Sequence, residues 1–522
     1  MTRRTSRSIT RPWIGLAASL LAGTAAAQSA PTAPAAPAAP ATAPAGERLR
    51  NNEALLMLDY QVIKVPGDAP IDLMGFHVHS KVRDGVYLGA GVYAPHLKGE
   101  YGGFMAFDVG AHLRHRLTGP WFATADLSGG GGGGGRSIAQ STLLSGTGGF
   151  VRGSVGLAYD AGPFAVGASA TRMKFRRSLI DSSHASVFVT IPYTYLTGAF
   201  SRHGGALSAA EDRQAGAEMG ENMLTVSFDN FRQIDPQGSN KGAVRTVDLQ
   251  YSHYFAPDAY WFAALGVGYK GLPIYNQMLG GVGRRVRLSQ DFSLYGQVGV
   301  GSGGYAPELI DTGPGLLLYP KVSLEYALTR SLGLAVSAGY LTAPKATSRN
   351  QTYALALTQH LRSGGPAGSS VDPATWRGFR VSFFQQTEFN LSYRGIARDN
   401  LQLIGIQVDT PLGGPWYLPV QAAVATNDYL GYPGYGELLA GVGLQTHAGP
   451  GDRWQAFGQL MGGANVHGLG YKLSGGLRYI VDDRISVQLA AGHIETRKSD
   501  GRRFSADSLG FGLDYRFAVP IR

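Results

Sequence analysis

Two short stretches hold residues that could do chemistry, and the first contains a pair of histidines. His77 and His79 alternate with apolar residues, so a β-strand would place both of them, together with Lys81, on one face. Histidines two residues apart on a strand can share a metal ion. No third ligand stands nearby in the sequence, so hydrogen bonding inside the protein is the expected role of the pair.

The second stretch combines one acidic residue with several basic ones. Asp108, His112, Arg114 and Arg116 would share one face of a strand. An Asp–His pair could orient a nucleophile, but we find no serine–histidine arrangement that would complete such a site. A salt-bridge network is the simpler interpretation, because inward charges must be paired or hydrated. We therefore predict no catalytic residue, no metal site, no cofactor and no enzymatic activity.

A run of seven glycines, Gly129–Gly135, resembles a phosphate-binding loop only superficially. The Lys-Ser/Thr pair that follows the glycines in such loops is missing, and no strand-to-helix context surrounds the run. Because the run follows a predicted strand, we expect a flexible surface loop.

The composition limits the class of protein. The 522 residues include 75 glycines and no cysteine, and only 16% are charged. No run of 18 or more apolar residues follows the N-terminus, which excludes a bundle of membrane-spanning helices. The absence of cysteine excludes disulfides and cysteine-bound metals. The net charge of +10 could attract lipopolysaccharide phosphates or an anionic solute, although scattered strand-end Arg and Lys explain it more simply.

The N-terminus has the pattern of an exported protein. Residues 1–27 combine a basic segment, an apolar core from Trp13 to Gly23 and an Ala-x-Ala site before Gln28, which predicts a cleaved signal peptide. Residues 28–50 are rich in Pro and Ala and predict an extended periplasmic spacer.

From Asn51 onward the chain reads as three copies of eight short strands. The copies span residues 51–197, 221–362 and 378–522, with polar linkers at 198–220 and 363–377. Their sixth strands carry Arg152-x-Ser154, Lys321-x-Ser323 and Lys472-x-Ser474. Connections after even-numbered strands are mostly short and those after odd-numbered strands tend to be longer, which predicts that both chain ends lie in the periplasm.

The end of the chain identifies the architecture. Leu509, Phe511, Leu513, Tyr515 and Phe517 alternate with small or polar residues. This segment resembles the terminal strand of bacterial outer-membrane barrels, which usually ends on an aromatic residue, here Phe517. The resemblance implies an all-β, transmembrane antiparallel β-barrel in the outer membrane of a Gram-negative bacterium. Its implied partners are outer-membrane lipid, lipopolysaccharide and the barrel-assembly machinery, with no nucleic acid.

Two arrangements of about 24 strands fit the repeats. One large barrel is slightly preferred, because several barrels in one chain are rare. Three tandem eight-stranded barrels are the alternative, favoured by the long linkers and by small inward residues such as Gly333, Ala335 and Ser337.

Inward-facing basic residues make up the candidate site. They are Arg114, Arg116, Arg152, Arg285, Arg287, Lys321, Lys472 and Arg478, with the candidate lumen histidines His77, His79 and His112. In one lumen these cations would form a conduit that favours anions. In three small barrels they would instead pair with Asp59, Asp126, Asp229 and Glu325.

The predicted function follows from the first of these arrangements. It is a passive channel or export conduit for a polar or anionic solute or polysaccharide. The alternative is a structural or adhesive surface protein without a pore, and a lipid-modifying enzyme is a third hypothesis.

Overall fold

The computed structural model describes residues 50–136, 140–211, 222–329, 332–360, 375–447, 452–497 and 501–521. The predicted signal peptide (1–27), all but the last residue of the predicted spacer (28–50), residues 212–220 of the first linker and residues 363–374 of the second lie outside the described residues. The described residues belong to one compact unit that begins at Glu47. Within them, no helix has the length and apolarity needed to cross a membrane.

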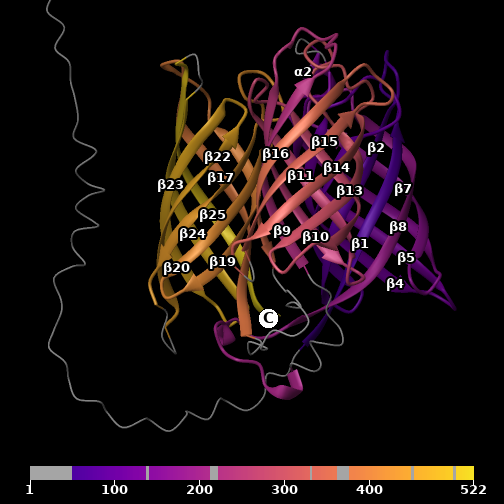
Figure 1. The fold of residues 1–522 in the computed structure, drawn as a ribbon. Coiled ribbons are helices and arrows are strands. Elements are labelled where there is room, and N and C mark those ends of the chain that lie inside the picture. Colours follow the sequence, from indigo (N-terminus) through magenta and orange to yellow (C-terminus); the bar gives the residue numbers. More distant parts are fainter. Residues whose placement is uncertain are drawn as a thin grey trace, which may run out of the picture. The chain divides into compact units, whose positions relative to one another are not determined.

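The first eight strands close into barrel 1 (Figure 1). They are β1 (Arg50–Ile63), β2 (Ile71–Arg83), β3 (Val86–Pro95), β4 (Met105–Arg116), β5 (Trp121–Gly133), β6 (Gly149–Asp160), β7 (Ala165–Phe175) and β8 (Asp181–Thr197). Each strand pairs antiparallel with the next, and β1 pairs with β8, with Leu56 opposite Ile191. Every strand in this barrel therefore has a hydrogen-bonded neighbour on both sides.

Two further sheets close in the same way. Barrel 2 consists of β9 (Asn222–Gln233), β10 (Val244–Tyr254), β11 (Ala259–Lys270), β12 (Asn276–Arg287), β13 (Phe292–Gly304), β14 (Leu316–Ala327), β15 (Leu332–Thr342) and β16 (Arg349–His360). Barrel 3 consists of β17 (Thr375–Tyr393), β19 (Leu401–Gly413), β20 (Trp416–Ala425), β21 (Gly436–Gln445), β22 (Trp454–Asn465), β23 (Gly468–Ile480), β24 (Ile485–Arg497) and β25 (Arg503–Ile521). β16 pairs with β9, β17 pairs with β25, and the two-residue β18 (Ile396–Ala397) extends the end of β17.

The all-β barrel architecture is thus confirmed in its three-barrel form, and the slight preference for one 24-stranded barrel was wrong. The physical reason lies in the curvature that glycine permits on the inner face. A side chain at Gly283 would collide with the ring of Tyr260, and one at Gly443 with the ring of Tyr417. These glycines let eight strands close around large aromatic side chains.

The outward faces of the barrels are apolar. On β5 and β6, for example, Leu127 is 70% exposed and Val155 is 64% exposed, whereas Arg152 and Ser154 are buried inside. This distribution, with polar residues inside and apolar residues outside, is the inverse of that in a soluble protein, and it is typical of a barrel surrounded by lipid.

The two ends of the barrels differ. One end, which we call the α2 end, carries the longer connections and the short helix α2 (Ser141–Ser145). The opposite end, which we call the η1 end, carries tight turns such as 84–85 and the 3-10 helix η1 (Phe200–Arg202). Figure 1 shows the C-terminus near this second end.

The described part of the first linker docks on barrel 3. Gly198 pairs with Ala518 of β25, and the Asp483 carboxylate accepts hydrogen bonds from the backbone N–H groups of Phe200 (2.6 Å) and Ser201 (3.0 Å). The chain that leaves barrel 1 is therefore held by the last barrel before it enters the second.

A cation–π contact completes this docking, and an ion pair within the linker supports it. Arg202 lies 4.4 Å above the ring of Trp376 and donates a hydrogen bond of 2.6 Å to Glu211. The Arg202 guanidinium lowers the pKa of Glu211 to about 2. Because this value is below the usual one, the ion pair stabilises the docked linker above about pH 4.5 and is lost as the pH falls toward 2.

Each barrel should fold without the other two, because its first and last strands are hydrogen-bonded to each other and leave no open sheet edge. We expect a fragment of residues 375–522 to form a detergent-resistant barrel that migrates differently before and after boiling. A fragment of residues 292–447, which joins half of barrel 2 to half of barrel 3, has two open edges and should not show this shift. Equal behaviour of both fragments on electrophoresis would contradict independent closure.

Candidate functional site

The interior of barrel 1 gathers the candidate histidines. His77 Nε2 lies 3.4 Å from the Asp108 carboxylate, and His112 Nδ1 lies 2.6 Å from that of Asp126. The ring of His79 stands between them, with its centroid 5.8 Å from His77 and 5.7 Å from His112. All three histidines are buried, so the structure brings together residues from β2 and β4 that the sequence had only placed on separate strands.

Arg152 completes this cluster from the opposite wall. Its guanidinium donates to the Asp59 carboxylate at 3.0 Å, and both side chains are buried. A cavity of about 10 Å³ remains among these residues, and a single water molecule needs about that much space. The cluster therefore has no room for a substrate.

The contacts within the cluster are those of a buried salt-bridge network. Ser154 donates its hydroxyl proton to Asp126 at 2.6 Å, so it does not bond to His112 as a nucleophile would. Among the described residues, no group of three or more His, Cys, Asp or Glu side chains is arranged to hold a metal ion. The paired charges hold the barrel walls together instead.

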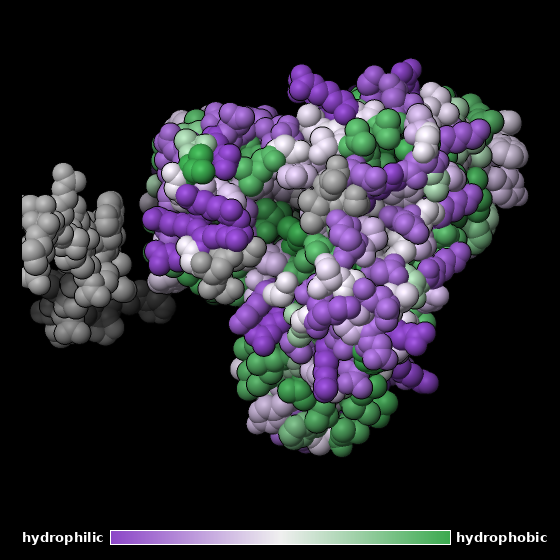
Figure 2. Space-filling view, turned by 90° about the horizontal axis from the view of Figure 1, so that it is seen from above, coloured by the Kyte–Doolittle hydropathy of each residue, from purple (hydrophilic) through white to green (hydrophobic). Residues whose placement is uncertain are grey.

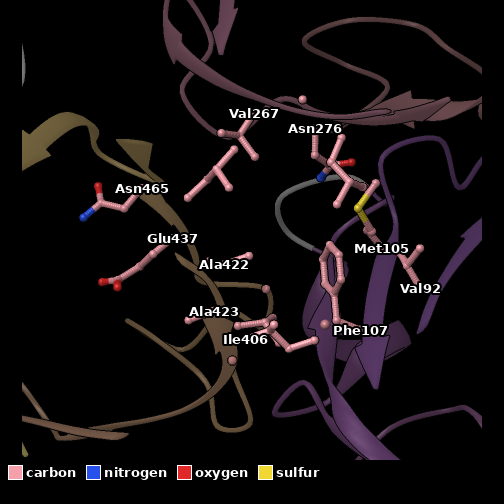
Figure 3. Close-up of a pocket in the computed structure, with 18 of the residues that line it drawn as sticks. Val92, Met105, Phe107, Val267, Asn276, Ile406, Ala422, Ala423, Glu437 and Asn465 are labelled. Carbon is pink, nitrogen blue, oxygen red and sulfur yellow. The ribbon is translucent and has the colours of Figure 1, made fainter. Parts of the chain in front are cut away.

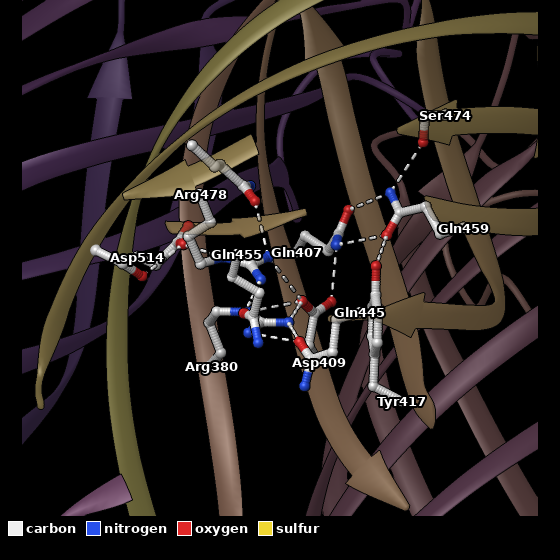
Figure 4. A network of polar contacts seen from close by, with 12 residues as sticks. Arg380, Gln407, Asp409, Tyr417, Gln445, Gln455, Gln459, Ser474, Arg478 and Asp514 are labelled. Atoms are coloured by element: carbon white, nitrogen blue, oxygen red, sulfur yellow. Dashed lines mark hydrogen bonds and ion pairs between the residues drawn. The ribbon is translucent and has the colours of Figure 1, made fainter. Parts of the chain in front are cut away.

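Barrel 3 contains an extended polar network (Figure 4). The Arg380 guanidinium donates to Asp409 at 2.6 and 2.9 Å, and Arg478 donates to Asp514 at 2.9 Å. Arg478 also lies 3.8 Å from Asp409, so one carboxylate lies between two guanidinium groups. This network spans the barrel near its η1 end.

Lys472 belongs to a second buried group in the same barrel. Its ammonium donates to Gln386 at 2.7 Å and lies 3.7 Å from the Glu437 carboxylate. A cavity of about 30 Å³ remains beside it. Barrel 3, like barrel 1, is filled by side chains at mid-height.

Barrel 2 is filled mainly by aromatic rings. Tyr260, Phe262 and Tyr295 belong to its buried core. Arg285 lies 4.5 Å above the ring of Tyr254, and the half-buried Lys321 lies 5.4 Å from the ring of Tyr319. Cations in this barrel pack on aromatic faces.

The remaining candidate cations lie near the strand ends of barrels 1 and 2. Arg114 is half-buried, stacks on Phe122 at 3.6 Å and forms an ion pair with Asp160 at 3.4 Å. Arg116 and Arg287 are exposed. The candidate cations are thus divided among three interiors and their rims and do not line one conduit.

Four carboxylates were expected to pair with the candidate cations, and the structure confirms this only in part. Asp59 pairs with Arg152 as expected for three barrels. Asp126 pairs with His112, Asp229 accepts a hydrogen bond from the Tyr319 hydroxyl at 3.2 Å, and Glu325 pairs with His360 at 2.7 Å. Of these three partners, only His112 was among the candidate residues of the sequence analysis, and the Tyr319 hydroxyl offers Asp229 a hydrogen bond instead of a charge.

The strand register shows that Lys321 is not the structural equivalent of Arg152 and Lys472, with which the sequence analysis aligned it. Arg152 lies opposite Ser128 and Lys472 opposite Met461, which are equivalent positions of the fifth strands. In barrel 2 the residue at this place is Tyr319, opposite Gly299, and Lys321 lies one pleat nearer the η1 end. This shift explains why barrel 2 has an aromatic side chain where the other two have a cation.

A reciprocal amide pair recurs in barrels 2 and 3. Gln250 and Gln297 exchange hydrogen bonds of 3.1 and 3.3 Å, and so do Gln407 and Gln459. The register places His77 and Asp126 of barrel 1 at the positions of these glutamines. Barrel 1 therefore has ionisable groups where its two relatives have neutral ones.

Arg380 and the four glutamines were missed by the sequence argument. A signal was present, because Arg380 alternates with Ser382 at the start of the third copy, as Arg152 does with Ser154. The glutamines carry no charge, and their pairing joins strands that are 47 and 52 residues apart. Only the closed barrel brings them into contact.

The glycine run has a defined role, and the expectation of a flexible loop was wrong. Gly129–Gly133 belong to β5. A Cβ atom at Gly131 would collide with the backbone carbonyl of Ala425 in barrel 3, and one at Gly133 would lie 2.7 Å from Pro433. The missing side chains let the walls of barrels 1 and 3 touch through their backbones.

Comparison with known proteins gives no family. No protein-family model and no curated protein matches the chain. The outer membrane protein Ail of Yersinia pestis is 16% identical, over 27% of this chain and 99% of Ail, with a TM-score of 0.20. The ferric enterobactin receptor of Pseudomonas aeruginosa is 10% identical over 89% of this chain and 81% of the receptor (TM-score 0.28), and the NanC porin 11% over 56% and 98% (0.17). These structures are similar in kind, but scores this low carry no argument about function.

Removing one member of a buried ion pair should destabilise barrel 1. Replacement of Arg152 by Met leaves the Asp59 carboxylate buried without its cation, and we expect a loss of about 3–5 kcal/mol of unfolding free energy. The double variant R152M/D59N should recover most of this loss. Denaturant unfolding in detergent measures the effect, and R116Q at the exposed rim serves as the control, with a change within about 0.5 kcal/mol.

Substitution in the glycine run should separate barrels 1 and 3. Gly131→Leu places a side chain against Ala425, whereas Gly296→Leu on β13 meets nothing within 4 Å and is the matched control. Because the chain has no cysteine, spin labels at K174C and D399C report the distance between the two barrels. We expect a longer or broader distance distribution for G131L alone, and an unchanged one would contradict the backbone contact.

Proposed function

We propose that this chain is an integral outer-membrane protein with three sealed barrels, and that it acts through the surface of its α2-end loops. The observation that carries the proposal is the ion pairing across the interiors, at 3.0 Å for Arg152–Asp59 and 2.6 Å for Arg380–Asp409. A conduit needs charges that are free to meet a passing ion. These charges are buried and already neutralised.

The outer surface supports a place in the membrane. Exposed apolar side chains cover the outward faces of the strands. Trp121 meets Tyr159 edge-on with ring centroids 5.4 Å apart, and Trp454 lies tilted against Tyr479 at 5.0 Å, at strand ends near the η1 end. Such amphipathic rings are enriched where a membrane meets water. On this proposal the partners are outer-membrane lipid and lipopolysaccharide.

The α2 end supports a role in surface contacts. The Thr142 hydroxyl of α2 donates to the backbone carbonyl of Gly431, so the loops of barrels 1 and 3 adjoin. Next to this bond, Leu143 is 61% exposed, and Leu430 and Tyr432 are exposed as well. Clustered apolar side chains on an exposed loop surface favour contact with another macromolecule. This observation favours the structural or adhesive alternative over the conduit.

The other two hypotheses have less support. A conduit for a polar or anionic solute would rest on half-buried cations such as Arg114 and Lys321, which already stack on aromatic rings. A lipid-modifying enzyme would need an activated nucleophile, and Ser154 bonds to a carboxylate instead of a histidine.

Electrical recording separates the sealed protein from the conduit. We expect the purified protein to give no steady conductance in a planar bilayer in which a known porin is active. The triple variant R152Q/K321Q/K472Q should remain silent and unfold at a lower temperature, because buried carboxylates lose their cations. Stepwise, anion-selective conductance that weakens in the triple variant would instead establish the conduit.

A further inference from the structure

A cavity of about 330 Å³ lies between the three barrels, outside their interiors. Its wall is made of outward-facing residues from each barrel, including Phe107 of β4, Val267 of β11, Ile406 of β19 and Ala422 of β20 (Figure 3). These residues continue the same apolar faces that are exposed elsewhere around the barrels. The cavity is therefore a recessed part of the outer apolar surface.

Contacts between the barrels enclose this space. Barrels 1 and 3 meet at the glycine run described above. Barrels 1 and 2 meet where the Asn276 amide donates to the Gly103 carbonyl at 3.0 Å. Barrels 2 and 3 meet where a Cβ atom at Gly468 would lie 3.2 Å from the Tyr269 carbonyl. The backbone N–H of Gly102 in barrel 1 also donates to the Gly313 carbonyl in barrel 2 at 2.8 Å. Because backbone atoms meet at each junction, the barrels cannot close the space by moving nearer to one another.

The cavity is unsuited to water. Asn276, Glu437 and Asn465 border it, but the Asn276 amide donates to the Gly103 carbonyl, and Figure 3 shows the polar groups of the other two turned away from the cluster of apolar side chains. Glu437 accepts a hydrogen bond from Tyr435 at 2.8 Å, and Asn465 donates to Thr496 at 2.9 Å, both within barrel 3. A buried water needs two to four polar partners, and an empty cavity destabilises a protein in proportion to its volume.

We propose that an acyl chain of an outer-leaflet lipopolysaccharide molecule occupies this cavity. The volume is more than twice the roughly 150 Å³ of an apolar cavity that binds benzene, which corresponds to a chain of about twelve carbons. The proposal rests on the membrane location proposed above. It adds a defined lipid site that joins the barrels.

The position of the cavity identifies the leaflet. Met105 and Asn276, which line it, are the first residues of β4 and β12, and both strands begin at the α2 end. With the chain termini in the periplasm, as the loop lengths predict, this end faces the outer leaflet. Figure 2, seen from the α2 side, shows apolar residues in the hollow where the three lobes meet, with hydrophilic residues around it. An acyl chain can therefore enter while its headgroup stays among polar side chains.

Lipid retention by the full-length chain tests the proposal. The protein is purified from the outer membrane in mild detergent, washed extensively and examined by native mass spectrometry and lipid extraction. We expect lipopolysaccharide to remain bound to the wild type and to be lost in Ala422→Trp, because the indole fills the cavity. Val267→Trp fills the same space from barrel 2. The matched control is Ala338→Trp, on an exposed outward position of β15.

The outcomes are distinct. Folding of each variant is checked first by its migration before and after boiling, so that loss of lipid is scored only in folded protein. Retention of lipopolysaccharide by A338W but not by A422W or V267W supports the proposal. Equal retention by all variants, no retention by the wild type, or retention of phospholipid alone would overturn it. Failure to fractionate with the membrane would instead overturn the membrane location.

Discussion

The rest of this structure depends on the hydrogen bonds that join the first strand of each sheet to its last. An open edge leaves a row of unpaired backbone N–H and C=O groups, which is unacceptable in hydrocarbon. Pairing β1 with β8, β9 with β16 and β17 with β25 removes all such edges after eight strands. Closure at eight strands then leaves an interior just wide enough for side chains to fill, and buried polar and aromatic side chains occupy all three interiors.

In a narrow interior, every charged side chain that points inward is buried and needs a partner. Breaking one member of a buried pair costs far more than the pair contributes, so carboxylates and guanidinium groups are matched across the barrels. The three barrels fill their interiors in different ways. Barrel 3 uses Arg380, Asp409, Arg478 and Asp514, barrel 2 fills the space with tyrosines, and barrel 1 places histidines beside carboxylates. The three barrels therefore share one wall geometry and differ in the side chains that fill it.

Strand alternation made the fold class predictable, because lipid on one face and side chains on the other impose a period of two residues. The alternation of Leu509 to Phe517 is found as part of β25, and the inward direction of His77 and His79 also followed from it. The number of barrels did not follow, because one closed sheet of 24 strands and three of eight have the same local pattern. The partner of His112 and the role of Gly131 depend on stagger and on contact between barrels, which no local pattern encodes.

The docked linker has a consequence for biogenesis. Gly198 pairs with Ala518 of β25, the last strand of barrel 3, and Asp483 holds the turn beside it. The seat for the segment that leaves the first barrel therefore exists only after β25 has been inserted into barrel 3. A truncated chain could close its first barrel but could not anchor it. Closure of the last barrel thus acts as a checkpoint for anchoring the first, because the linker that leaves barrel 1 docks only on a complete barrel 3.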